Sequence, residues 1–140
     1  MKRNKGNSVW LLPLVLDGGL VVDFRDDHVH VQLGRNLKVT SEQRETAWLR
    51  IAEICDENGT RRVLVEGRAP EGVLDTTEII DAGLKAATVP RLWMAFCFEA
   101  FIPDELSELY ETVAASKGVR VKHFSNPEAA LHWLRTNAPA

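Results

Sequence analysis

The chain has 140 residues and a formal net charge of -3, with 45% hydrophobic and 26% charged residues. This length predicts one domain with a buried core, and the balance of apolar and charged residues excludes disordered, collagenous and fibrous proteins. The slight acidic excess lacks the basic footprint of a nucleic-acid-binding protein and offers no attraction to an anionic membrane, so neither partner is expected.

The first 19 residues are predicted to form a segment outside the domain. A basic start and the apolar run 9–16 suggest an export signal, but no small-residue cleavage site follows and the run is too short to span a bilayer. We therefore expect a cytoplasmic protein in which residues 1–19 pack on the sheet or at a dimer interface. In that compartment Cys55 and Cys97 would be reduced thiols, and their apolar neighbours predict buried, unreactive side chains.

A single domain is predicted over residues 20–136, and it opens with a hairpin. Residues 20–24 and 28–33 are rich in β-branched side chains and are separated by an aspartate-containing turn. Thr40 and Gln43 then form a capping-box signature at the start of a helix. This opening predicts two antiparallel strands followed by a helix.

Helices and strands alternate through the rest of the domain. Strands are expected at residues 62–66, 92–98 and 119–123. Further helices are expected to start at three capping signals, which are Asp75, Asp104 and the proline-containing capping box 125–128. Such an alternation demands parallel strands joined by right-handed crossovers. The predicted fold class is α/β, with a mixed, mostly parallel five-stranded sheet and four helices.

The predicted strand 92–98 is apolar in both of its alternating sets of residues, which is typical of an interior strand buried on both faces. Helices that cross over between neighbouring parallel strands all lie on one face of the sheet. Another segment must then cover the second face, and the candidates are the 9–16 run and a second copy of the chain. A homodimer is one expected outcome.

His28 and His30 point the same way from one predicted strand, with Asp26 and Asp27 close by. Two histidines with carboxylates are the minimum of a mixed metal site, yet two ligands alone do not make one. We interpret this pattern as the solvated face of the hairpin, whose aliphatic residues point inward. No other spacing in the sequence predicts a metal ion or a cofactor.

Three polar residues, Glu66, Glu99 and His123, each end a predicted parallel strand. Open α/β sheets bind ligands at the carboxyl ends of their strands, and two nearby glutamates can form an acid–base pair. However, no nucleophile or glycine-rich phosphate loop accompanies these residues, and glutamate is common in exposed loops. A small-molecule pocket or enzyme site built from them is the alternative to a protein-binding function.

Asp75, Thr76, Thr77 and Glu78 lie where a loop enters a predicted helix, so both hydroxyls are close to free backbone N–H groups. A phosphate on Thr76 would add about -1.5 to -2 charges beside Asp75 and Glu78, and would repel an acidic partner or remodel the helix start. The structural alternative is an aspartate cap followed by first-turn threonines.

The hairpin, the turn into the first helix, the strand 62–66 and the helix start Asp75-Thr76-Thr77 together resemble the STAS domain, the anti-sigma-factor antagonist family. The closing segment 121–134, with its Ala-Leu-x-Trp-Leu helix, is similar to a less characterised branch of small proteins in that superfamily. The resemblance covers most of residues 20–135.

In that family the helix start reads Asp-Ser-Ser-Gly, and a partner kinase phosphorylates the first serine, which ends binding to that partner. The resemblance implies that Asp75 takes the place of the aspartate, Thr76 that of the phosphorylated serine and Thr77 that of the second serine. Glu78 departs from the glycine. We therefore predict a non-catalytic regulatory protein-protein interaction module whose partner is a cognate kinase or an anti-sigma-like regulator.

Overall fold

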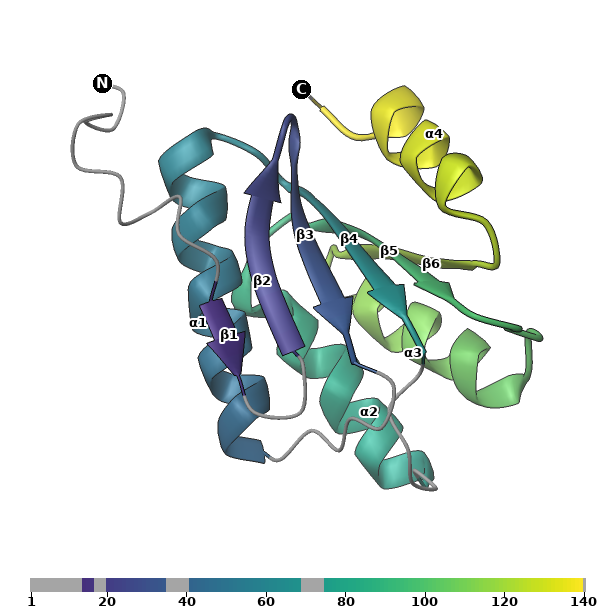
Figure 1. Cartoon of the computed structure of the whole chain (residues 1–140). Coiled ribbons are helices and arrows are strands. Elements are labelled where there is room, and N and C mark those ends of the chain that lie inside the picture. Colours follow the sequence, from purple (N-terminus) through teal and green to yellow (C-terminus); the bar gives the residue numbers. More distant parts are fainter. Residues whose placement is uncertain (1–13, 17–19, 35–40, 69–74, 140) are drawn as a thin grey trace.

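A six-stranded sheet in the order β1-β2-β3-β4-β5-β6 forms the centre of the protein (Figure 1). The computed structural model describes residues 14–16, 20–34, 41–68 and 75–139. The strands are β1 (Leu14–Leu16), β2 (Leu20–Arg25), β3 (His28–Leu33), β4 (Arg62–Gly67), β5 (Trp93–Phe98) and β6 (Arg120–Phe124). The predicted α/β fold is confirmed, and the short edge strand β1 adds to the five strands expected from the sequence.

Strand β2 pairs antiparallel with both β1 and β3. Strands β3, β4, β5 and β6 pair parallel with one another in that order. Strands β2 and β3 form the expected hairpin, in whose turn Asp26 adopts a left-handed conformation with φ 55, which aspartate tolerates better than most residues. Strands β3 to β6 all run the same way, so their carboxyl ends share one edge of the sheet.

The helices are α1 (Ser41–Asn58), α2 (Thr76–Lys85), α3 (Glu105–Ser116) and α4 (Pro127–Asn137), and a 3-10 turn η2 (Ala86–Thr88) follows α2. Asp75 and Asp104 are the N-caps of α2 and α3, as predicted. The predicted cap at Ser125 is wrong by one residue. Asn126 caps α4, because its side-chain oxygen accepts from two backbone N–H groups and Pro127 takes the first helical position. Thr40 lies outside the described residues.

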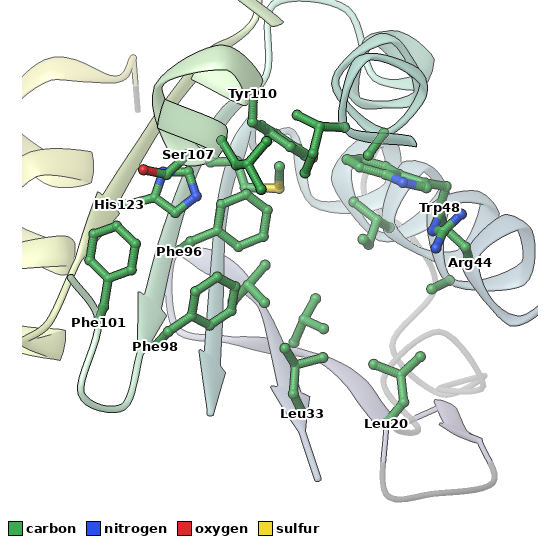
Figure 2. Close-up of a pocket in the computed structure, with 18 of the residues that line it drawn as sticks. Leu20, Leu33, Arg44, Trp48, Phe96, Phe98, Phe101, Ser107, Tyr110 and His123 are labelled. Carbon is green, nitrogen blue, oxygen red and sulfur yellow. The ribbon is translucent and has the colours of Figure 1, made fainter. Parts of the chain in front are cut away.

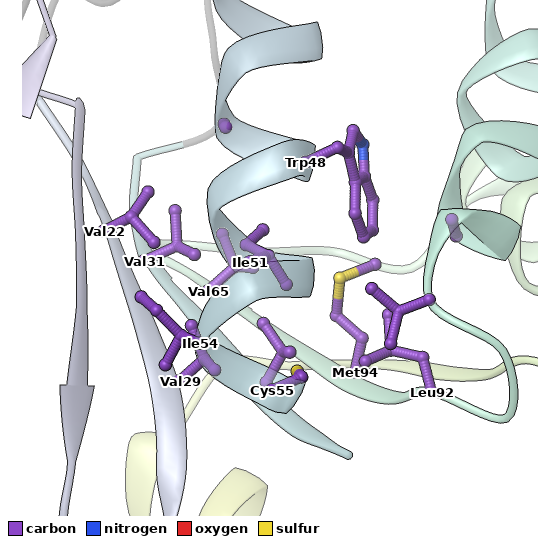
Figure 3. Packing of buried hydrophobic residues seen from close by; sticks show 14 of the residues in the cluster. Val22, Val29, Val31, Trp48, Ile51, Ile54, Cys55, Val65, Leu92 and Met94 are labelled. Carbon is purple, nitrogen blue, oxygen red and sulfur yellow. The ribbon is translucent and has the colours of Figure 1, made fainter. Parts of the chain in front are cut away.

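Helix α1 supplies much of the main hydrophobic core, which it forms with the face of the sheet that also carries α2 and α3. Figure 3 shows Trp48, Ile51, Ile54 and Cys55 of α1 directed toward the valines of the sheet and Met94. Ile54 and Cys55 are fully buried. At about 1.5 to 3 kcal/mol for each large side chain removed from water, this contact is a major source of stability.

Helix α4 covers the opposite face of β4, β5 and β6 (Figure 1). Ala130 and Leu134 of α4 pack with Leu64, Ala95 and Cys97 of the sheet in a second core. The prediction that only the 9–16 run or a second copy could cover this face is therefore wrong. The crossover rule constrains helices that join two parallel strands, whereas α4 follows the last strand and is free to fold onto the other side.

The second core predicts a large effect of truncating α4. Leu134→Ala should lower the free energy of unfolding by about 2 to 5 kcal/mol, because it removes a fully buried side chain and leaves a cavity. Urea unfolding followed by circular dichroism measures the change. The matched control is Leu49→Ala on α1, where the side chain is 57% exposed and the expected change is within about 0.5 kcal/mol. Equal changes would contradict the packing of α4 on the sheet.

Candidate functional site

A cavity of about 510 Å³ lies between the sheet and helices α1, α2 and α3. We call it the helical-face cavity. Fifteen of the 20 described residues that line it are apolar, and the other five are Arg44, Asp104, Ser107, Tyr110 and His123. It lies over the carboxyl half of the parallel strands, where open α/β sheets bind ligands.

The floor of the cavity is a row of residues paired across four parallel strands. Val31 of β3 pairs with Val65 of β4, Val65 pairs with Phe96 of β5, and Phe96 pairs with His123 of β6. Residues paired in register point to the same face of a sheet. Leu33 and Phe98 extend this floor to the carboxyl edge. The floor is therefore apolar except at His123.

The cavity has room because α2 packs on α3. Gly83 of α2 lies so close to α3 that a Cβ built there would be 2.9 Å from Cγ1 of Val113. Glycine permits this close approach. The inner face of α2 places Ile79 and Ala82 at the cavity. The position of α2, set by its contact with α3, thus forms one wall.

His123 is held in a fixed position at one side of the cavity (Figure 2). Its ring stacks between Phe96 and Phe101, at centroid distances of 5.0 and 5.2 Å. Its Nδ1 lies 2.7 Å from Oε2 of Glu111, and the same oxygen accepts the backbone N–H of His123 at 3.1 Å. The imidazole is therefore a flat, preformed wall with one nitrogen already engaged.

The other polar groups of the cavity are mostly engaged in local structure. The Ser107 hydroxyl donates to the backbone oxygen of Asp104 and accepts the backbone N–H of Asp104. The Asp104 carboxylate accepts the N–H of Ser107. Burial raises the pKa of the Tyr110 phenol well above its ordinary value, although the Arg44 guanidinium acts in the opposite direction. Tyr110 therefore stays protonated at neutral pH and can donate a hydrogen bond.

The structure does not bring Glu66, Glu99 and His123 together. Glu66 pairs with Cys97 across the parallel ladder, whereas His123 pairs with Phe96, so the two side chains point to opposite faces of the sheet. Glu99 is exposed, and its Oε1 lies 3.9 Å from Nε of Arg68. Of the three predicted residues, His123 lines the helical-face cavity.

Glu66, which is half-buried, instead pairs with the buried His30 on the α4 side of the sheet. Its Oε1 lies 2.6 Å from Nε2 of His30, and Nδ1 of His30 lies 3.9 Å from Oδ1 of Asp23. Burial raises the pKa of the neighbouring Cys97 thiol, and the Glu66 carboxylate adds to the rise. Burial also raises the pKa of Cys55 to about 12. Both cysteines are free and buried, as predicted.

The turn of the β2–β3 hairpin has a structural role, because Asp27 joins it to β4 and α4. We call this cluster of hydrogen bonds around Asp27 the Asp27 clamp. His28 and His30 are both buried, so the prediction of a solvated face is wrong. Strand β3 is an interior strand, and its polar side chains find partners on neighbouring elements. Asp27 accepts from His28, from Arg62 at 3.0 Å and from Arg135 of α4 at 2.9 Å. In the described parts of the chain, no three or more His, Cys, Asp or Glu residues group into a potential metal site.

The predicted helix start at Asp75 is a complete capping box. Oδ1 of Asp75 accepts the backbone N–H of Glu78 at 2.8 Å, and the Glu78 carboxylate accepts the backbone N–H of Asp75 at 3.0 Å. Thr76 and Thr77 are exposed in the first turn of α2. Glu78, which departs from the glycine of the antagonist family, therefore has a structural role.

Comparison with models of protein families, with curated proteins and with solved structures found no match for this chain. The similarity to anti-sigma-factor antagonists therefore stays a prediction from the sequence. Within the described residues, every helix is too short or too polar to cross a lipid bilayer.

The helical-face cavity was not predicted from the sequence. The available signal was the aromatic density around the end of β5, where Phe96, Phe98, Phe101 and Tyr110 fall within 15 residues. Arg44 carried no signal, because a single arginine on a helix is usually exposed to solvent. Its position at the cavity emerges only once α1, α2, α3 and the sheet are brought together.

The Asp27 clamp predicts a pH-dependent contribution to stability. Hydrogen bonding from Arg135 holds the pKa of Asp27 well below its ordinary value of 3.8. A carboxyl with a lowered folded-state pKa stabilises the protein above its unfolded-state pKa, and this contribution is lost as the pH falls below about 4. Asp27→Asn should therefore lower the free energy of unfolding by about 2 kcal/mol at pH 7 and by less at pH 3.

Urea unfolding at both pH values measures this difference. Asp26→Asn is the matched control, because Asp26 is an exposed neighbour in the same turn whose Oδ2 lies 3.7 Å from Arg135. The control should change the free energy of unfolding by at most about 1 kcal/mol. The same pH dependence for both variants would contradict the role of Asp27.

Proposed function

We propose that the protein is a non-catalytic binding module that takes a small apolar molecule into the helical-face cavity. The cavity itself carries this proposal. Its volume of about 510 Å³ falls within the range of about 300 to 1,000 Å³ that is typical of small-molecule sites. A lining dominated by aliphatic and aromatic side chains favours an apolar ligand, because burial of apolar surface is the main source of affinity there.

The arrangement of polar groups supports binding over catalysis. Nucleophilic catalysis needs a hydroxyl or thiol within hydrogen-bond reach of a base. The Ser107 hydroxyl makes both of its hydrogen bonds within the cap of α3, and the engaged nitrogen of His123 faces Glu111. The thiol of Cys97 lies on the α4 side of the sheet.

Filling the cavity should weaken binding of an apolar probe. Ala82→Phe places a large ring where the inner face of α2 meets the cavity. We expect the wild type to bind the neutral probe N-phenyl-1-naphthylamine with a rise in fluorescence, and the variant to bind at least tenfold more weakly because the ring occupies the same space. A fluorescence titration measures both affinities.

The matched control is Ala129→Phe, which adds the same ring at an exposed position of α4 on the other side of the sheet. It should bind the probe as the wild type does. Circular dichroism checks that both variants are folded. A folded Ala82→Phe variant with wild-type affinity would overturn the proposal.

A second proposed function is docking of a protein partner on the outer face of α2, in agreement with the resemblance to anti-sigma-factor antagonists. Thr76, Ile80 and Leu84 are spaced four residues apart and therefore share one face of the helix. Thr76 is exposed, and the side chains of Ile80 and Leu84 are 37% and 41% exposed. An apolar stripe that begins at a modifiable hydroxyl supports a phosphorylation-controlled regulatory contact in the cytoplasm.

This second function predicts that Thr76→Glu weakens binding of at least one partner. The added carboxylate lies beside Asp75 and Glu78 at the end of the apolar stripe, and docking would have to remove it from water. Affinity capture of partners by wild-type and variant protein, quantified by mass spectrometry, measures the loss. Thr136→Glu, at an exposed position of α4, is the control. A Thr76→Glu variant that retains every wild-type partner would contradict the switch.

A further inference from the structure

We propose that the ligand of the helical-face cavity is a single-headed aliphatic carboxylate and that Arg44 binds its carboxylate group. This inference rests on the proposed small-molecule function and names the chemical class of the ligand. It is carried by one arginine placed at the side of a mostly apolar cavity.

Arg44 is a half-buried residue of α1 that lines the cavity. Among the residues that the structure describes, none forms a hydrogen bond or ion pair with its guanidinium. The adjacent acid, Glu45, is engaged elsewhere, because its Oε1 accepts from Nζ of Lys85 at 3.0 Å. Burial raises the pKa of the Tyr110 phenol, and the positive charge of Arg44 acts in the opposite direction. Arg44 thus presents positive charge to the cavity without a partner in the described structure.

An anionic ligand would supply the missing partner. Removing part of the hydration of a guanidinium costs free energy when no hydrogen-bond acceptor replaces the lost water. A carboxylate can accept two parallel N–H bonds from arginine, and such charge-assisted bonds are roughly twice as strong as neutral ones. Tyr110, which keeps its proton at neutral pH, is a second donor on the same cavity.

The placement of charged and apolar residues around the cavity indicates a ligand with one charged end. Figure 2 shows Arg44 and Trp48 on one side of the cavity, while Phe98, Phe101 and His123 lie on the opposite side. The Asp104 carboxylate, which is the acid of the lining, is engaged in the cap of α3. A ligand with its carboxylate at Arg44 would extend its chain over the apolar floor toward the phenylalanines. A medium-chain fatty acid has this form.

The test compares three ligands with the same ten-carbon chain, which are decanoate, decanol and decyltrimethylammonium. Displacement of N-phenyl-1-naphthylamine from the full chain gives their affinities. Decanoate should bind about tenfold more tightly than decanol, as expected for one charge-assisted contact, and the cationic ligand should bind more weakly than both. Arg44→Gln should bring the affinity for decanoate close to that for decanol, and Arg44→Lys should restore part of the preference for decanoate.

Arg120→Gln is the matched control, because Arg120 is exposed on β6 and does not line the cavity. It should leave all three affinities unchanged. If decanol binds the wild type as tightly as decanoate, or if Arg44→Gln weakens both equally, the inference is overturned and the proposed apolar site stands. If neither the probe nor any of the ligands binds, the proposed function and this inference both fail.

Discussion

Strand β5 constrains the whole architecture because it is apolar on both faces. Met94 and Phe96 require cover from one side, and Ala95 and Cys97 require it from the other. An exposed strand of this composition would leave large apolar surfaces in water on two sides. The protein meets the requirement by placing three helices on one face of the sheet and the terminal helix α4 on the other.

The two layers are packed differently, and the difference creates the candidate site. On the α4 side, small and large side chains pack together closely. The buried histidines of β3 pair there with Asp27 and Glu66. On the other side, α1 packs on the sheet while α2 packs on α3 through Gly83. Open space remains beneath α2 as a result. The cavity is therefore present because the short helix α2 packs on α3.

Local signals in the sequence were sufficient for the fold class and for the order of helices and strands from β2 to α4. The caps Asp75 and Asp104 predicted two helix starts, and the doubly apolar strand predicted the interior of the sheet. Predictions that depended on long-range arrangement were less successful. The sequence placed His28 and His30 on one face of a strand, yet their burial depends on residues far away in the chain, such as Glu66 of β4, which pairs with His30.

The candidate site shows the same limit. Each of Glu66, Glu99 and His123 does lie at or near the end of a parallel strand. Whether such residues meet depends on register, since a shift of one residue moves a side chain to the opposite face of the sheet. The pairing of Phe96 with His123, and of Cys97 with Glu66, separates them. Register is set by packing across the sheet, which no single strand encodes.

The two proposed functions share helix α2, which has ten residues. Its inner face, with Ile79 and Ala82, lines the cavity, and its outer face carries Thr76, Ile80 and Leu84. A ligand can influence docking on the outer face only to the extent that it binds one position of α2 more tightly than another. Because the tight contact with α3 at Gly83 restricts how α2 can move, any such coupling would have to involve α3 as well. Helix α3 contacts both the cavity and α2, because its Tyr110 lines the cavity and its Val113 lies against Gly83.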